Sequence, residues 1–169
     1  MGATMAQVSR LLAAYARGER RFVHWELTGA DLRGRDLRGI DLRGARLRNA
    51  RLTQARLDGA VLAGADLAGA RLDGARLRHA ALQFVVLCDA ALRNADLGET
   101  DLTGANLVRA DLSWAILEWT NLMRADLSDA ILEGTDFACA DLRGAAFGRE
   151  AADVVRWQRA KPSASLIVG

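Results

Sequence analysis

The sequence predicts a single all-β solenoid, in which the chain winds through stacked coils built from one short repeated unit. From Phe22 to Phe147 every fifth residue is Leu or Phe, which makes 26 consecutive units without a break. The residue two places before this Leu or Phe is Ala in 18 of the 26 units. Gly stands two places after it in many units, as at Gly34 and Gly64.

A period of five fits neither a helix, which repeats its apolar residues every three or four positions, nor a regular strand, which alternates them. Residues two apart point to the same side of an extended segment, so the Ala and Leu of each unit can both face inward. The other residues must then turn a corner, and Gly suits a turn position with an unusual φ. Four corners close a square coil, and successive coils would stack about 4.8 Å apart, as strands do.

The chain resembles the pentapeptide-repeat family over about 126 of its 169 residues. Three stretches show the common unit: Ala30-Asp31-Leu32-Arg33-Gly34, Ala65-Asp66-Leu67-Ala68-Gly69 and Ala105-Asn106-Leu107. The resemblance implies a right-handed quadrilateral β-helix, with Leu or Phe at the centre and Ala filling the corners. It implies no single activity, because members range from topoisomerase inhibitors to proteins of unknown role, and a fold does not set a function.

The repeat divides the chain into three parts. Residues 1–21 are expected to hold a capping helix and a lead-in, residues 22–147 the repeat, and residues 148–169 a second capping helix and a tail. Open solenoid ends need such caps. Met5 to Ala16 carries an apolar stripe of helical spacing, formed by Val8, Leu11, Leu12 and Tyr15. The second helix is expected from Glu150 to Lys161, and the resemblance implies that a C-terminal cap can join two copies into a homodimer.

No constellation of residues indicates an enzyme, a cofactor or a metal ion. The two histidines, His24 and His79, fall on different corners about three coils apart, so they cannot share a metal ion. Cys88 and Cys139 point outward on different corners, beyond the reach of a disulfide. A lumen filled with Leu and Ala would leave no pocket for a substrate. We therefore expect a non-enzymatic protein without a cofactor or a bound metal.

The sequence also bears on location. It contains no apolar run of 18 residues that would span a membrane, and its beginning lacks the charged and apolar regions of a secretory signal. Two unpaired thiols fit a reducing compartment. We expect a bacterial cytoplasmic protein that makes no contact with a membrane.

Charge is unevenly distributed along the chain. Residues 1–85 carry 15 Arg and 8 acidic residues, a net charge of +7, whereas residues 86–169 carry 8 Arg or Lys and 13 acidic residues, a net charge of −5. The first half holds a candidate basic patch, a ring of four arginines and two pairs spaced by twenty residues: Arg33, Arg38, Arg43, Arg48, Arg51, Arg56, Arg71 and Arg76. These arginines would contact phosphates or an acidic partner, or neighbouring aspartates such as Asp31 and Asp58 would neutralise them. Nucleic acid ranks last among the partners, because the aromatic residues and Gly-rich loops of a dedicated binder are missing nearby.

The acidic second half favours a different function. The resemblance implies that some family members are DNA mimics that act on gyrase, a type II topoisomerase, through acidic residues. The acidic residues of this half include Asp96, Glu99, Asp101, Asp111, Asp126, Asp129, Asp136 and Asp141. The net positive charge of the whole chain and the lack of an inserted loop count against this function. Most of these aspartates also occupy the ordinary repeat position, where they would bond to the local turn.

Outward apolar residues in the second half give the best indication of a binding surface. Trp114 and Trp119 occupy the corner position where Gly is commonest, on adjacent corners of one coil. The candidate partner-binding residues are Trp114, Ile116, Trp119, Met123 and Ile131. Exposed aromatic residues among apolar ones indicate a protein interface. The alternative is that the C-terminal helix or the tail from Leu166 to Val168 folds back and covers them. We expect first a protein-interaction scaffold of unidentified partner, second a topoisomerase-directed DNA mimic, and third nucleic-acid binding through the basic half.

Overall fold

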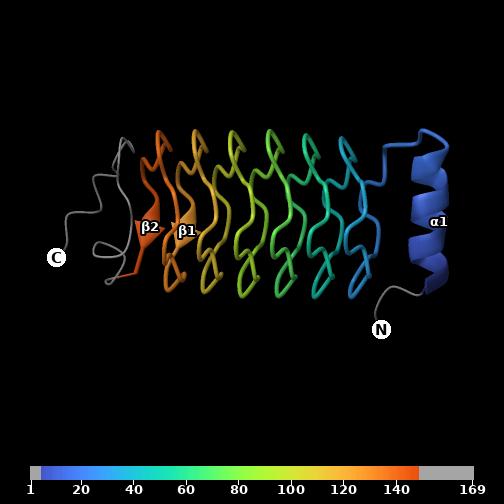
Figure 1. The fold of residues 1–169 in the computed structure, drawn as a ribbon, viewed down its shortest axis with the longest axis horizontal. Helices are drawn as coiled ribbons and strands as arrows, with labels where there is room; N and C mark the ends of the chain where they lie inside the picture. Colours follow the sequence, from blue (N-terminus) through green and yellow to red (C-terminus); the bar gives the residue numbers. More distant parts are fainter. Residues whose placement is uncertain (1–4, 149–169) are drawn as a thin grey trace.

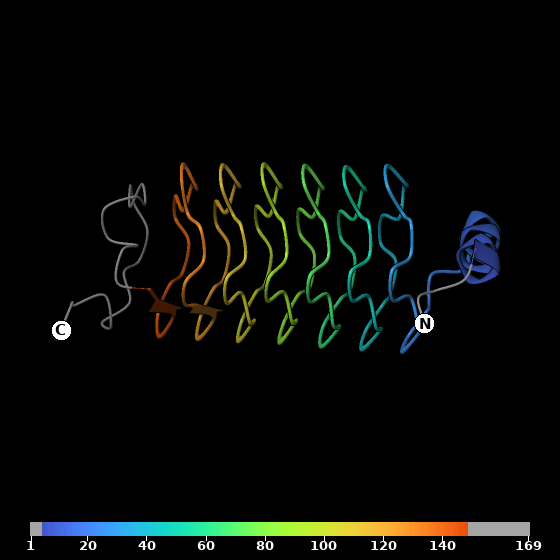
Figure 2. The same cartoon turned by 90° about the horizontal axis from the view of Figure 1, so that it is seen from below.

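The structure is a computed structural model that describes residues 5–148, and these residues form a rod of stacked coils with one helix across its N-terminal end (Figures 1 and 2). The helix, α1, spans Met5–Ala16, the range that its apolar stripe predicts. Two short strands near the other end, β1 (Asp126–Leu127) and β2 (Ala146–Phe147), pair in parallel. None of the helical structure in this part of the chain has the length and apolarity that a membrane-spanning helix needs.

The backbone confirms the square coil that the period of five predicts. The residue before each central Leu bridges to the residue twenty positions later in a parallel register, as Arg51 does to Arg71 and Arg71 to Ala91. The Leu52 amide donates to the Arg71 carbonyl at 2.7 Å, and the Arg71 amide donates to the Ala50 carbonyl at 2.9 Å. Each coil is therefore hydrogen-bonded to the coil before it and to the coil after it, which satisfies backbone groups that would otherwise be buried without partners.

Every corner is a tight turn that begins at the central Leu. At one of them the Ala55 amide donates to the Leu52 carbonyl at 2.9 Å. The third residue of such a turn has positive φ, 57° at Gln54, whereas the second residue does not. This combination defines a type II turn, which prefers Gly or Asn at its third position. The Gly preference in the sequence is thus a requirement of the corner.

The core is a column of inward Leu, Phe and Ala side chains. Nearly all of the central Leu and Phe side chains along the described coils are completely buried. Three inward Ala positions carry Thr instead, and their hydroxyls find backbone acceptors, as the Thr120 Oγ1 donates to the Leu97 carbonyl at 2.8 Å. A small polar side chain therefore enters the lumen without leaving a buried hydroxyl unpaired.

Helix α1 closes part of the first coil. Leu11 and Ala14 are buried against the core, and the Tyr15 hydroxyl donates to the Arg38 carbonyl at 2.8 Å. Arg35 occupies an inward Ala position of this coil, and its side chain is exposed. The helix expected at 150–161 and the tail at 166–168 lie outside the described residues.

Candidate interaction surfaces

One side of the rod carries Ile116 between the corners of Trp114 and Trp119, and we call residues 114–119 and the residues stacked on them the Trp-flanked side. Trp114 is 59% exposed and Trp119 is 66% exposed. Ile116 is also exposed and stacks between Asp96 and Asp136 of the neighbouring coils. The structure thus places these three predicted residues on one side of one coil, where residues 5–148 leave much of their apolar surface uncovered.

The two tryptophans adopt backbone angles that bulky residues rarely take. The φ angle is 60° at Trp114 and 58° at Trp119, in the third position of the type II turn. A bulky side chain there is strained. The Trp114 ring lies over Gly134 of the next coil, since a Cβ built on Gly134 would come within 2.4 Å of the ring atom Cε3. The ring therefore occupies space that a side chain at position 134 would fill.

Phe84 is a further exposed aromatic residue of the same kind, and it is not among the predicted binding residues. It is 67% exposed, has φ of 56°, and lies over Gly104 as Trp114 lies over Gly134. The sequence holds the signal for this arrangement, which is a large residue at the third turn position followed twenty residues later by Gly.

The other two predicted binding residues lie around the corners from the Trp-flanked side. Ile131 is half exposed and bridges to Asp111 on the preceding side of the square. Met123 belongs to the following side and is half-buried, with the Arg143 Nη2 3.3 Å from its sulfur. The five residues therefore spread over three sides, and only Trp114, Ile116 and Trp119 share one.

Charge changes along the Trp-flanked side. Towards the N-terminal end, Arg78 is the last arginine on this side within residues 5–148, and it forms ion pairs with the carboxylates of both Asp96 and Glu99. Beyond it, Glu118 and Asp136 have no ion pair with any residue of 5–148. The sequence places no Arg or Lys among residues 115–119 or 135–139. The apolar part of this side is therefore flanked by carboxylates that form no ion pair with residues 5–148, although Glu118 lies close enough to Arg78 for their charges to interact.

The eight arginines of the candidate basic patch are all ion-paired. Within one unit, the Arg33 Nε and Nη2 donate to both carboxylate oxygens of Asp31, at 2.8 and 2.6 Å. The same fork joins Arg38 to Asp36 and Arg43 to Asp41. The remaining five reach acids of their own or a neighbouring coil: Arg48–Asp66, Arg51–Asp31, Arg56–Asp36, Arg71–Asp73 and Arg76–Asp58. The arrangement matches the alternative in which neighbouring aspartates neutralise the patch.

These ion pairs lower the pKa values of the aspartates. The hydrogen bonds from the Arg33 side chain lower the pKa of Asp31 to about 2, and those from Arg38 lower the pKa of Asp36 to about 2. The geometry is bidentate, which is the strongest form of the Arg–carboxylate interaction. Since the side chains are solvent-exposed, water screens each pair and its contribution to stability is small.

The residues that carry catalytic chemistry elsewhere do not gather here. Within residues 5–148, no group of three or more His, Cys, Asp or Glu side chains could hold a metal ion. His79 faces Glu99, with its Nδ1 3.4 Å from the carboxylate, and His24 lies at another corner, over Gly44. Cys88 and Cys139 are both free thiols.

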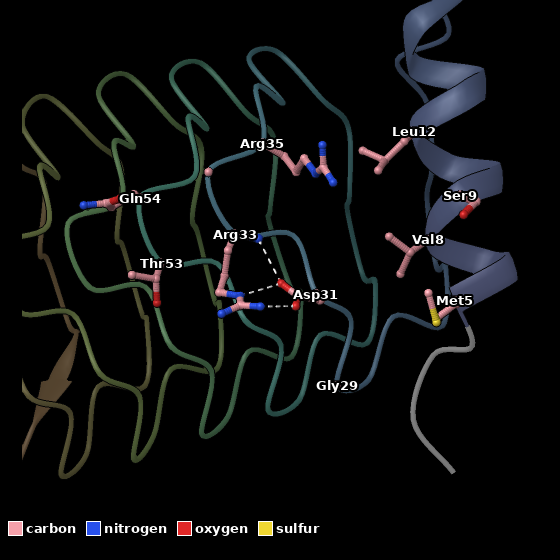
Figure 3. A pocket seen from close by; sticks show the side chains of 11 residues that line it. Met5, Val8, Ser9, Leu12, Gly29, Asp31, Arg33, Arg35, Thr53 and Gln54 are labelled. Atoms are coloured by element: carbon pink, nitrogen blue, oxygen red, sulfur yellow. Dashed lines mark hydrogen bonds and ion pairs between the residues drawn. The ribbon is translucent and has the colours of Figure 1, made fainter.

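The expectation that the protein has no pocket is wrong at its N-terminal end. A cleft of about 820 Å³ lies between α1 and the rim of the first coil (Figure 3). Helix residues such as Val8 and Leu12 form one wall, and Arg33 and Arg35 belong to the other. The lumen itself is filled, as predicted. The cleft exists because α1 covers only part of the open coil.

Comparison with protein families finds a match to a model described as pentapeptide repeats, in 8 copies, over residues 26–62, 45–83, 55–91, 80–118 and 120–149. Comparison with curated proteins finds no match.

Several solved structures resemble the chain. QnrB1, a plasmid-mediated fluoroquinolone resistance protein, is 20% identical over 86% of this chain and 81% of that chain, with a TM-score of 0.43. HetL, a pentapeptide repeat protein involved in heterocyst differentiation regulation in the cyanobacterium Nostoc, is 26% identical over 95% and 94%, with a TM-score of 0.28. A pentapeptide repeat protein from the Arabidopsis thaliana thylakoid lumen is 28% identical over 68% and 69%, with a TM-score of 0.32. At these scores the neighbours carry no argument about function.

The pairing of the basic patch can be tested through Asp31. Replacing Arg33 by Ala should raise the pKa of Asp31 from about 2 toward 3.8, because its main hydrogen-bond donor is lost. A carboxylate with a lowered pKa stabilises the fold above its unfolded pKa and loses this contribution as the pH falls toward the folded pKa, here between 3.8 and about 2. Carboxyl-carbon NMR titration measures the shift, and Arg71→Ala is the control because Arg71 contacts Asp73. A parent Asp31 that already titrates near 3.8 would show that the pair does not persist in solution.

The packing of Trp114 can be tested with two glycines of matched φ. Gly134→Ala and Gly64→Ala both place a side chain at a positive φ, 66° and 65°, but only Gly134 lies under a ring. Both variants should lose about 1 kcal/mol of unfolding free energy from backbone strain. Gly134→Ala should lose more and should shift the tryptophan emission, because the Trp114 ring must move. Urea unfolding and fluorescence measure both effects, and equal behaviour of the two variants would contradict the stacking.

Proposed function

This chain belongs to the pentapeptide-repeat family, whose repeats match most of its length, and we propose that it is a non-enzymatic scaffold that binds another protein through its Trp-flanked side. The observation that carries the proposal is the exposure of Trp114 and Trp119 on adjacent corners with Ile116 between them. A cytoplasmic location stays a prediction from the two unpaired cysteines.

The strained backbone at these corners supports the proposal. Gly satisfies this turn position at no cost, and it does so at many other corners, such as Gly59 and Gly104. A Trp there costs conformational energy and exposes apolar surface without adding to the buried core. Large aromatic side chains held in one orientation are the residues that most often dominate the binding energy of protein interfaces.

The surrounding charges indicate the chemistry of the partner. The carboxylates of Glu118 and Asp136 lie on the same side as the apolar residues, and Glu133 lies next to Gly134, on which the Trp114 ring packs. A partner surface with apolar residues flanked by Lys or Arg would complement this side, and the opposite charges would speed association. The basic half of the chain would contribute less, since its patch arginines are already paired.

Photo-crosslinking in cells tests the proposal. A photoreactive phenylalanine analogue at Ile116 should capture one partner protein, whereas the same analogue at Val108, a half-buried position on another side, should not. Binding of the purified partner should weaken at least tenfold in the Trp114→Ala/Trp119→Ala double variant, because anchor residues of this kind contribute about 2 kcal/mol or more each. Isothermal titration calorimetry gives the affinities.

Phe84→Ala is the matched control, since Phe84 is equally exposed and also packs on a glycine, but at another corner. It should leave the affinity unchanged. Equal capture of the partner protein from Ile116 and Val108 would contradict the proposal. A crosslink from Ile116 to residues 149–169 of the same chain would instead mean that the C-terminal segment covers the Trp-flanked side.

A second candidate is a DNA mimic that acts on a type II topoisomerase. The observation that favours it is the run of acidic residues without an ion pair to residues 5–148 in the C-terminal coils, which includes Asp126, Asp129, Glu133 and Asp136. The basic coils at the other end count against it, because a DNA mimic must present negative charge to a positively charged DNA-binding surface, which would repel those coils.

Gyrase supercoiling with increasing amounts of the purified protein, with and without a quinolone, tests this candidate. If the acidic coils act on the enzyme, inhibition or drug protection should occur at stoichiometric amounts, and Asp129→Lys/Glu133→Lys should abolish it. Arg124→Ala, at an exposed position in the same coils, is the control. No effect at a large excess of protein would remove the candidate.

A further inference from the structure

The cleft at the N-terminal end combines an apolar wall with an exposed cation. Its volume of about 820 Å³ lies within the range of about 300–1,000 Å³ that small-molecule sites occupy. The side chains of Val8 and Leu12 point from α1 toward the coil, and Arg35 extends from the coil toward Leu12 (Figure 3). Met5, which is 89% exposed, lies at the other end of the apolar wall.

Arg35 is out of place in the repeat. It stands at an inward position where most units have Ala, and it is exposed because the coil is open there. Its guanidinium forms no ion pair with any residue between 5 and 148. Neither the packing of the lumen nor the ion pairs of the surface therefore explain the choice of Arg.

The neighbouring acids are already engaged. Asp31 contacts both Arg33 and Arg51, and Asp36 contacts both Arg38 and Arg56. The charged side chains that line the cleft are Arg33, Arg35 and Asp31, so with Asp31 paired to Arg33 the charge of Arg35 is left over. Helix α1 contains no acidic residue that could offset it. The electrostatic field in the cleft therefore favours an anion.

The shape of the cleft specifies the rest of the ligand. Leu12 and Met5 are seven residues apart on α1, which is about 10 Å along the helix axis. An extended alkyl chain of medium length would lie along Leu12, Val8 and Met5. A carboxylate at its Leu12 end would meet the Arg35 guanidinium, whose planar fork matches a carboxylate in a bidentate pair. We propose that the cleft between α1 and the first coil binds an aliphatic carboxylate, with its carboxylate on Arg35 and its chain along the apolar face of α1.

Calorimetric titration with decanoate, below its micellar concentration, tests the site. The parent protein should bind decanoate, and Arg35→Ala should weaken binding at least tenfold, about the effect of one charge-assisted hydrogen-bonded pair. This variant restores the residue that most units carry, so the fold should be kept. Arg48→Ala, which removes an arginine paired with Asp66 on another side, should bind as the parent does.

Two further arms separate the parts of the ligand. Decan-1-ol has the same chain without the charge and should bind about tenfold more weakly than decanoate, while Val8→Asp should abolish binding by placing a carboxylate in the apolar wall. The Trp114→Ala/Trp119→Ala variant should bind decanoate normally. No binding by the parent, equal binding by Arg35→Ala, or loss of binding in the tryptophan variant would each overturn the proposal.

Discussion

The structure depends on one constraint, the type II turn that must close after every fifth residue. The turn sends the chain around a lumen just wide enough for Leu, Phe and Ala, and it brings each bridging residue beside the residue twenty positions later. Two residues of each unit then face inward, and the third turn residue must adopt a positive φ. Only the residues on either side of the central Leu are free of both demands. Selection for function can act mainly on these positions and, at a cost, on the corner.

Stacking at a fixed interval also controls the electrostatics. Side chains eighteen or twenty positions apart become neighbours, so Arg93 pairs with Asp111 and Arg109 pairs with Asp89. Charge counted along the chain therefore gives a poor account of the charge that a partner meets. The first half is strongly basic by sequence, yet every arginine of its candidate patch is ion-paired, whereas Arg35 at the rim forms no ion pair with residues 5–148. Around the Trp-flanked side, Glu118 and Asp136 form no ion pair with residues 5–148, so their carboxylates can interact with a partner.

The regular repeat explains which structural features could be predicted from the sequence and which could not. The coil, the range of α1 and the outward direction of Trp114 follow from spacing alone, because spacing decides which side of the backbone a residue occupies. Spacing does not decide where an outward side chain then leans. The packing of Phe84 on Gly104 depends on a rotamer, and so it was not predicted. The pairing of the patch arginines with Asp31 was one of the expected alternatives, but the forked geometry from Arg33 also depends on rotamers. The cleft was missed for a related reason, since the length of α1 does not specify how much of the coil it covers.

A regular lattice of this kind offers few places for recognition. Its lumen is filled and its sides are nearly flat, so a ligand can be held only where the pattern is interrupted. The coil of Trp114 and Trp119 interrupts it by replacing Gly with large rings, and the rim at Arg35 interrupts it by replacing Ala with a cation under a helix. Both departures carry a physical cost, in backbone strain at the tryptophans and in the loss of a packed inward Ala at Arg35, which is exposed instead. A cost that the fold does not require is the reason to look for function at these two places before the remaining surface.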